Sequence, residues 1–162
     1  MDPCAPLSKS QSPTKLEDIA KMRNVPYREA VGLLMYAAMG TRPDIAFVMS
    51  TAQYSENTGW KHWEAVKRIF HYLLGTKKLE LTYGGEKRGL VGYVDADGVS
   101  QDHRRAISGY VFMVKRGAVS WSSKKQGLVT LSTTEAEYVA ATYAGKEAIW
   151  LHHLPSGKYE IA

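Results

Sequence analysis

The stretch from Ser132 to Leu154 constrains the fold of this chain most, because it is a long helical pattern with an acid on its apolar side. Steps of about 100° per residue place Glu137 on a narrow stripe of small apolar side chains. The other members of this stripe are Ala140, Ala141, Ala144, Ala148 and Leu151. Such a stripe lets a helix lie close against a sheet. An acid within it is costly to bury unless a cation compensates its charge.

A second acid of this helix, Glu135, lies nearly opposite Glu137 and has an ordinary structural explanation. Ser132 and Glu135 match the capping box S/T-x-x-E, in which each side chain bonds a backbone N–H at the helix start. Glu137 has no such duty. The pattern therefore leaves two interpretations of Glu137: a partly exposed acid at the helix entrance, or one member of a charged site.

Composition limits the classes of function. The 162 residues have room for one core, or for a small domain with an appended piece. The formal net charge of +5 favours a polyanionic partner. The single Cys4 excludes an internal disulfide and a cysteine-based metal cage, and no apolar run is long enough to span a membrane. We expect an intracellular protein, cytoplasmic by default, with no membrane partner and no small-molecule substrate.

The first half of the chain has helical periodicity. Prolines and polar residues dominate Met1 to Thr14, and we expect a flexible arm over residues 1–25. Three apolar stripes at helical spacing follow, and each ends at a turn signal, namely Gly40, Asn57-Thr58-Gly59 and Gly75. Residues 26–85 are therefore predicted to form a helical segment.

The periodicity changes after Leu79. Leu90 to Val94 is apolar on both alternating faces, which predicts a strand covered from both sides that runs into Asp95 and Asp97. Asp97 beside Gly98 suits a turn, so Asp95 is the better candidate for a site. The next two predicted strands form a hairpin with a glycine-containing turn, followed by a basic loop. These segments are Ile107 to Val114, Lys115-Arg116-Gly117, Ala118 to Ser122, and Ser123 to Gly127. The pattern predicts an α/β fold with the order β-β-β-α over residues 86–154 and a tail over 155–162.

Six strings resemble the Pol polyprotein of copia-type retrotransposons, at the junction of reverse transcriptase and ribonuclease H. They are Y-R-E-A-V-G-L-L-M-Y-A-A-M-G-T-R-P-D-I-A (27 to 46), H-W-E-A-V-K-R-I-F-H-Y-L-L-G-T (62 to 76), G-Y-V-D-A-D (92 to 97), S-G-Y-V-F (108 to 112), S-W-S-S-K-K-Q (120 to 126) and L-S-T-T-E-A-E-Y-V-A-A (131 to 141). They cover most of residues 27–154 in the order of the family.

The resemblance implies that the helical segment follows the polymerase palm and resembles the reverse transcriptase thumb or connection. It also implies that residues from Leu90 onward form a partial ribonuclease H-like domain without its later strands and helices. Asp95 and Glu137 match the family's first two catalytic acids, which would hold Mg²⁺ or Mn²⁺. In the family's reaction, two such ions activate water and stabilise the leaving oxygen of a phosphodiester.

Basic residues supply candidate contacts to an RNA–DNA hybrid or another nucleic acid. Lys67 and Arg68 leave the apolar stripe of the third helical segment, as expected if a nucleic-acid backbone runs beside it. Arg104, Arg105, Lys124 and Lys125 are the candidates in the second half of the chain. The alternative for all six is an ordinary solvated surface.

The sequence also departs from the family. A later strand with Asp followed by Asn, and a further helix with another acid, do not follow, and Ala96 separates the two acids that a polymerase Tyr-x-Asp-Asp motif would join. We expect that the complete parent copies RNA into DNA and hydrolyses the RNA strand of hybrids. This chain alone, without the remainder of Pol, is expected to be inactive. The alternatives are a non-catalytic hybrid-binding module and a retrotransposon relic without a function.

Overall fold

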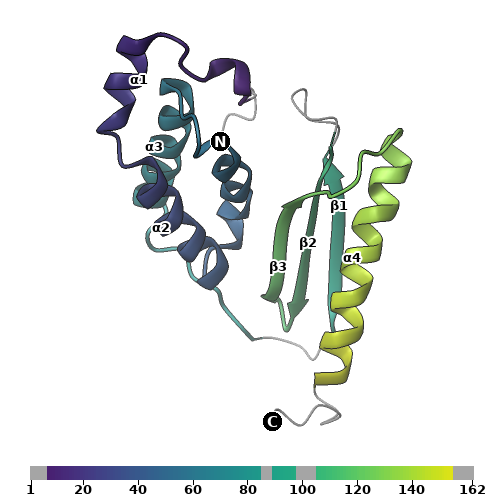
Figure 1. Ribbon diagram of the computed structural model, residues 1–162. Helices are drawn as coiled ribbons and strands as arrows, with labels where there is room; N and C mark the ends of the chain where they lie inside the picture. The colour runs from purple at the N-terminus through teal and green to yellow at the C-terminus, as the bar shows by residue number, and fades with distance from the viewer. Residues whose placement is uncertain (1–6, 85–88, 98–104, 155–162) are drawn as a thin grey trace, which may run out of the picture. The chain divides into compact units, whose positions relative to one another are not determined.

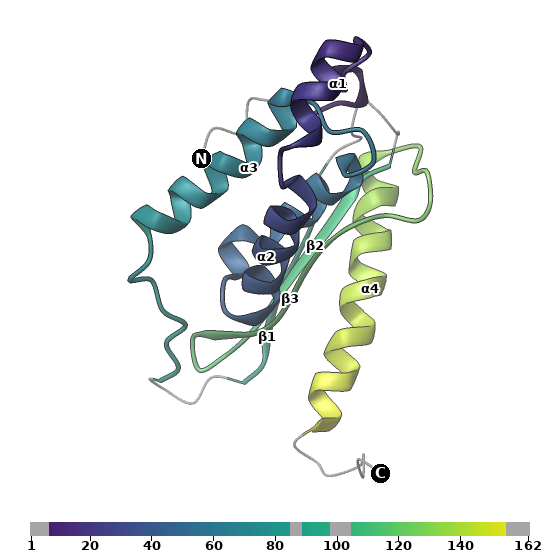
Figure 2. The same ribbon diagram turned by 60° about the vertical axis from the view of Figure 1, so that its left-hand side comes forward.

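The chain divides into two compact units, Met1–Glu80 and Leu81–Ala162. A computed structural model describes residues 7–84, 89–97 and 105–154. The described part of the first unit is helical, and that of the second holds a three-stranded antiparallel sheet and one long helix (Figures 1 and 2). This mixture of helices and strands is consistent with the α/β class predicted from the sequence.

The first unit contains the three helical segments that the sequence predicted. Its elements are η1 (Lys9–Gln11), α1 (Leu16–Arg23), α2 (Tyr27–Gly40), η2 (Pro43–Tyr54) and α3 (Trp60–Gly75). The middle segment, η2, is a 3₁₀ helix with a kink at Ile45, where φ is −108° and ψ is 16°. Pro43 stands in its first turn, where a missing backbone N–H costs nothing.

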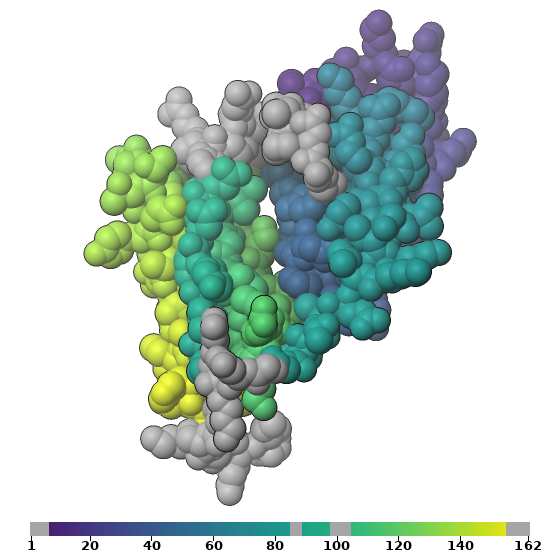
Figure 3. Space-filling view, turned by 180° about the vertical axis from the view of Figure 1, so that it is seen from behind, coloured from purple at the N-terminus to yellow at the C-terminus, as the bar shows by residue number. Residues whose placement is uncertain are grey.

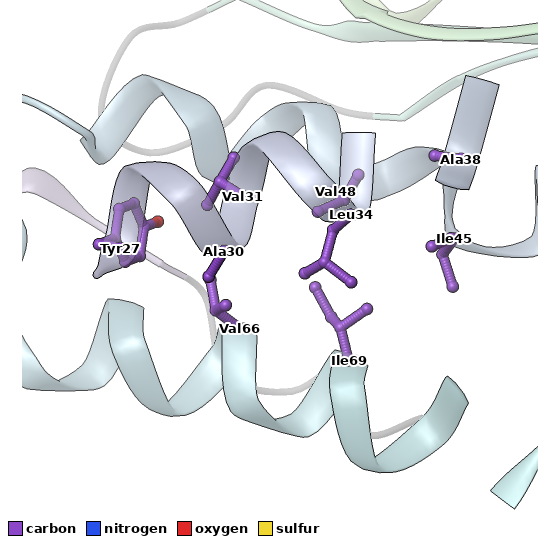
Figure 4. Packing of buried hydrophobic residues seen from close by; sticks show 9 residues of the cluster. All are labelled: Tyr27, Ala30, Val31, Leu34, Ala38, Ile45, Val48, Val66 and Ile69. Atoms are coloured by element: carbon purple, nitrogen blue, oxygen red, sulfur yellow. The ribbon is translucent and has the colours of Figure 1, made fainter. Parts of the chain in front are cut away.

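Side chains from α2, η2 and α3 form the core of this unit (Figure 4). Its fully buried members include Leu34, Val48 and Ile69. Tyr27 lies at one end of the core, and its hydroxyl donates to the Thr51 carbonyl over 2.8 Å. Burial raises the pKa of Tyr27 to about 12, so this hydroxyl stays protonated and keeps its donor role.

Part of the segment expected to be a flexible arm is held against the helices. The Tyr54 hydroxyl donates to the Leu7 carbonyl over 2.7 Å, and His62 Nε2 lies 3.0 Å from the Ser8 carbonyl. His62 Nδ1 accepts from the Gly59 N–H, so Nε2 carries the proton and is the donor to Ser8. In contrast, α1 has no buried residue.

The second unit contains β1 (Val91–Asp97), β2 (Ile107–Val114), β3 (Gly117–Lys125) and α4 (Thr133–His153). The sheet has the order β1-β2-β3, and each neighbouring pair is antiparallel. Helix α4 packs across β1 and β2 and runs opposite to β1 (Figures 1 and 2). The predicted order β-β-β-α is confirmed.

Two predictions about the strands were wrong. Strand β1 is not covered from both sides, because among the described residues it lies at the sheet edge and only Ala96 is half-buried. The apolar residues on both faces of β1 had predicted burial of both faces, but in the described structure α4 covers only one of them. The expected basic loop was the second error: Ser123, Lys124 and Lys125 are the last residues of β3 and pair with β2.

The β2–β3 turn also differs from its prediction. Lys115 and Arg116 adopt the left-handed region, with φ of 48° and 68°, while Gly117 begins β3. A two-residue turn with both φ angles positive matches the right-handed twist of the strands. Glycine is needed at Gly117 for another reason: the Tyr83 ring occupies the space of a Cβ there. The Tyr83 hydroxyl donates to the Ala118 carbonyl over 2.7 Å.

Candidate functional site

The first predicted acid, Asp95, lies near the end of β1. It is opposite Gly109 of β2, which is opposite Ser123 of β3. The next row on the same face holds Asp97, Ile107 and Lys125. Asp95 is exposed, and its neighbour Gly109 has no side chain to cover it. Asp95 therefore presents a solvated carboxylate with open space beside it.

The second predicted acid, Glu137, stands near the start of α4. The first turn is fixed by Ser132 Oγ, which accepts from the Glu135 N–H over 3.1 Å. Glu135 Oε2 accepts from the Leu131 N–H over 2.7 Å. The capping box predicted the N–H of Ser132, which is one residue later. Glu135 therefore caps the helix start as predicted but through a different backbone N–H, and Glu137 takes no part in the cap.

The apolar stripe of α4 is rotated from its predicted position. The buried residues are Ala136, Ala140 and Ala144, whereas Glu137 and Ala141 are exposed. The alanines of this helix spread over a broad arc of about 140°, so their spacing alone did not fix which part of the arc faces the sheet. Glu137 lies at the margin of the contact, and the predicted cost of a buried acid does not arise.

A buried amide joins β2, the neighbour of the strand of Asp95, to the helix of Glu137. Gln126 is 2% exposed, and its Nε2 donates to Ser108 Oγ and to the Ala136 carbonyl, each over 2.8 Å. Its backbone N–H donates to the Ala106 carbonyl over 2.8 Å. Ser108 is in turn opposite Ala96 in the sheet. Ala96, the residue after Asp95, therefore lies opposite Ser108 at one end of this hydrogen-bonded bridge. Ala136, the residue before Glu137, accepts at its other end.

Contacts with β3 show which side of α4 faces the free edge of β1. Ser120 Oγ of β3 donates to Glu147 Oε1 over 2.6 Å, and Gln126, directly after β3, bonds to Ala136. Ala136 forms one margin of the buried stripe and Glu147 projects close to it, so this margin is turned toward β3. Glu137, on the other side, is turned toward the outer edge of β1.

The two acids thus belong to the same end of the second unit. The end of β1 and the start of α4 lie together in Figure 1. Ser108 and Ala96 are on the face covered by α4, so by alternation Asp95 is on the opposite face. The two carboxylates can therefore approach each other only around the outer edge of β1.

The predicted nucleic-acid residues fall into two groups. Arg105 precedes β2, and Lys124 and Lys125 end β3, so these three lie at the end of the sheet where Asp97 stands. Arg104 is outside the described residues. Lys67 and Arg68 are on α3 in the other unit, and Lys67 Nζ lies 4.9 Å from the centre of the exposed Trp60 ring. This is the stacking expected of a cation over an indole.

Gln126 and Ser108 position the candidate site, and sequence reasoning missed both. Gln126 ends the string S-W-S-S-K-K-Q and was assigned to a solvated loop with its lysine neighbours. Its burial could have been suspected from position, because the alternation of β3 continued by one residue gives Gln126 the face of Lys124 and Ser122, on which α4 packs.

Comparison with known proteins shows the family. The chain is 52% identical over 147 residues to the retrovirus-related Pol polyprotein from transposon TNT 1-94 of Nicotiana tabacum, covering 90% of this chain and 11% of that protein. It is 36% identical over 143 residues to the Pol polyprotein from transposon RE2 of Arabidopsis thaliana, covering 86% of this chain and 9% of that protein. No protein-family model matches the chain. No solved structure matches it either.

The chain belongs to the family of copia-type retrotransposon Pol polyproteins. It spans only about a tenth of the length of these two relatives. A third relative, secreted RxLR effector protein 161 of Plasmopara viticola, is 46% identical over 134 residues, which are 80% of this chain and 94% of that protein. Within the part of the chain that the structure describes, no helix has the length and apolar character to cross a bilayer.

Replacing the bridging amide tests the positioning argument. Gln126→Met keeps the volume but leaves the Ser108 hydroxyl and the Ala136 carbonyl without this donor. We expect a loss of about 1 to 3 kcal/mol in the free energy of unfolding, measured by urea titration. The exposed Lys124→Met is the matched control and should change stability by less than about 0.5 kcal/mol. Equal stability of the two variants would contradict the bridge.

Proposed function

We propose that this chain corresponds to the junction of reverse transcriptase and ribonuclease H in a copia-type Pol polyprotein. In the complete parent, this region takes part in hydrolysing the RNA strand of RNA–DNA hybrids during reverse transcription within the cell. The observation that supports the proposal is the Gln126 bridge, which joins Ser108 of β2 to Ala136 of α4. Ser108 lies opposite Ala96, the residue after Asp95, and Glu137 follows Ala136.

The side chains present fit a divalent cation only in part. Carboxylate oxygens from Asp95 and Glu137 are the hard ligands that Mg²⁺ or Mn²⁺ prefers. The described residues contain no group of three or more His, Cys, Asp or Glu side chains that could hold a metal ion. Two carboxylates are too few to hold the two ions of a phosphodiester hydrolase. The isolated chain is therefore proposed to be inactive, and the parent is proposed to supply the missing acids.

Restoring the rest of the domain tests this proposal. In a chimaera, the residues that follow the matched stretch of the tobacco relative are joined after Leu154. We expect Mg²⁺-dependent cleavage of the RNA in a labelled RNA–DNA hybrid by the chimaera and none by the isolated chain. Asp95→Asn or Glu137→Gln in the chimaera should lower the rate by at least about 100-fold, since each removes a charged metal ligand.

Glu135→Gln is the matched control for Glu137→Gln. It lies two residues away on the same helix, and glutamine can still accept from the Leu131 N–H. The chimaera with this substitution should keep its cleavage rate. Cleavage that survives both Asp95→Asn and Glu137→Gln would place the chemistry elsewhere and refute the assignment of these acids.

Binding of a hybrid without cleavage is the second candidate function. The register places Lys125 in the same row and on the same face as Asp97, two strands away, so a positive side chain lies at the sheet end that holds the acids. Lys124 lies in the next row on the opposite face. A nucleic-acid backbone that reached Asp95 would pass close to this sheet end. Contacts of this kind depend strongly on salt, because each neutralised phosphate releases counterions.

A pair of lysine substitutions tests this binding. Lys124→Ala with Lys125→Ala should weaken hybrid binding and reduce the slope of log affinity against log salt by about 1 to 2. Lys77→Ala with Lys78→Ala removes the same charge from an exposed pair in the other unit. Equal effects of the two double variants, measured by fluorescence anisotropy, would show attraction to net charge and not a site at the sheet end.

A further inference from the structure

The outward face of α3 carries an aromatic ring among cations. Steps of about 100° per residue place six residues within an arc of about 120°, on the side of the helix opposite the buried Val66 and Ile69. Figure 3 shows α3, in teal, at the surface of the first unit. Five of the six residues are exposed, and Lys67 is half-buried. These residues form the outer stripe of α3, namely Trp60, Lys61, Glu64, Lys67, Arg68 and His71.

Trp60 stands out on this stripe because it leaves a large ring in water. It is 56% exposed, whereas tryptophan is on average a highly buried residue. Trp63, three residues later on the same helix, follows the usual pattern and packs against the core of the first unit. Exposed aromatic rings that also carry a polar group are enriched at binding surfaces. Trp60 is therefore the member of the stripe that points most directly to a ligand.

Two neighbours on the stripe fix the indole ring of Trp60. Its Nε1–H donates to Glu64 Oε1 over 3.0 Å. Lys67 Nζ lies 4.9 Å from the centre of the ring, which is the geometry of a cation–π contact. The ring is thus held in one orientation while more than half of the residue stays exposed. A ligand that stacks on it therefore loses little affinity to the ordering of this side chain.

The cations of the stripe are not neutralised by its acid. Glu64 precedes Lys67 by three residues and Arg68 by four, which are the spacings at which opposite charges on a helix attract each other. The Glu64 carboxylate accepts from the indole of Trp60 instead. In the part of the chain that the structure describes, neither these two cations nor Lys61 takes part in an ion pair. The stripe therefore presents three uncompensated positive charges beside one acid.

A single nucleic-acid strand matches this combination of ring and charge. Lys67 and Arg68 lie about 10 to 12 Å along the helix axis from Trp60, at about 1.5 Å per residue. A base stacked on the indole lets the neighbouring phosphates of the same strand pass these two cations. Aromatic platforms with cations along the backbone are the general means of binding single strands. Bases inside a duplex are already stacked on each other, so they do not offer a face to the ring.

We propose that the outer stripe of α3 binds single-stranded nucleic acid, with one base stacked on Trp60 and neighbouring phosphates held by Lys67 and Arg68. This site differs from the proposed hybrid-binding surface, which lies in the second unit and takes a duplex. It does not rest on the proposed nuclease function, because it uses neither Asp95 nor Glu137. Loss of cleavage and loss of single-strand binding are therefore separate results.

Two probes of equal charge separate base stacking from attraction between charges. One is a fluorescein-labelled oligothymidylate, and the other has the same number of phosphates but no bases. Fluorescence anisotropy of the full chain should show tighter binding of oligothymidylate. Trp60→Ala should lower the ratio of the two affinities at least about 5-fold, which is the lower bound for one stacked base. Trp60→Phe retains a ring and should keep most of this ratio.

Trp150→Ala is the matched control for Trp60→Ala. Trp150 stands on α4 in the second unit and is 46% exposed, so its removal takes a similar exposed ring from a surface outside the stripe. The ratio of affinities should not change. Equal losses in the two alanine variants, or an unmodified chain that binds both probes equally, would overturn the proposal. An equal effect of Trp60→Ala on a duplex of the same length would also overturn it, since stacking on an unpaired base would then not be the cause.

The salt dependence of binding tests the role of the cations. Lys67→Gln should reduce the slope of log affinity for oligothymidylate against log salt by about 0.7, the value for one phosphate contact of a single strand. Lys146→Gln is the matched control, because Lys146 Nζ lies 5.8 Å from the centre of the Tyr143 ring in a similar cation–aromatic pair on α4. It should leave the slope unchanged. Equal changes of slope in the two variants would show attraction to net charge and contradict a site on α3.

Discussion

The arrangement of the second unit depends on one buried amide. Gln126 is almost fully buried, and a buried amide N–H group must find acceptors to offset its lost hydration. Both acceptors of Nε2 are fixed in space: Ser108 Oγ on β2 and the Ala136 carbonyl on α4. Alanines alone would let α4 slide along the sheet, because their contacts are much alike at each turn. Together with the Ser120–Glu147 hydrogen bond, the amide fixes the register of helix against sheet and so the level of Glu137 relative to Asp95.

This constraint explains why the two acids occupy one end of the unit without being buried. Asp95 is on the sheet face away from α4, and Glu137 is on the side of α4 that is turned toward the β1 edge. Any group held by both carboxylates must therefore sit at that edge, beside the end of the strand.

The sequence predicted the order of elements well, because turn signals such as Gly40 and Gly75 and the change of periodicity after Leu79 depend on local chemistry. It failed where burial is decided by distant segments. Apolar residues on both faces of β1 suggested a central strand, yet α4 covers only one of them. The alanines of α4 spread over one broad arc, so Ala136 and Ala141 were equally good members of the buried stripe. Lys124 and Lys125 suggested a loop, although pairing with β2 continues through them. The site residues Asp95 and Glu137 were chosen by spacing and resemblance. Gln126 was missed because its segment was assigned to a loop, and the alternation that places it on the α4 face applies only to a strand.

The central proposal is that Asp95 and Glu137 bind one cation together at the outer edge of β1. Titration of the isotope-labelled chain with Mn²⁺, followed by nuclear magnetic resonance, measures this directly, because the ion broadens the signals of nearby nuclei. The account predicts that amide signals around Asp95 and around Glu137 broaden together, and that Asp95→Asn weakens the broadening at both places. Broadening around only one of the two acids, or an effect of Asp95→Asn confined to β1, would contradict it.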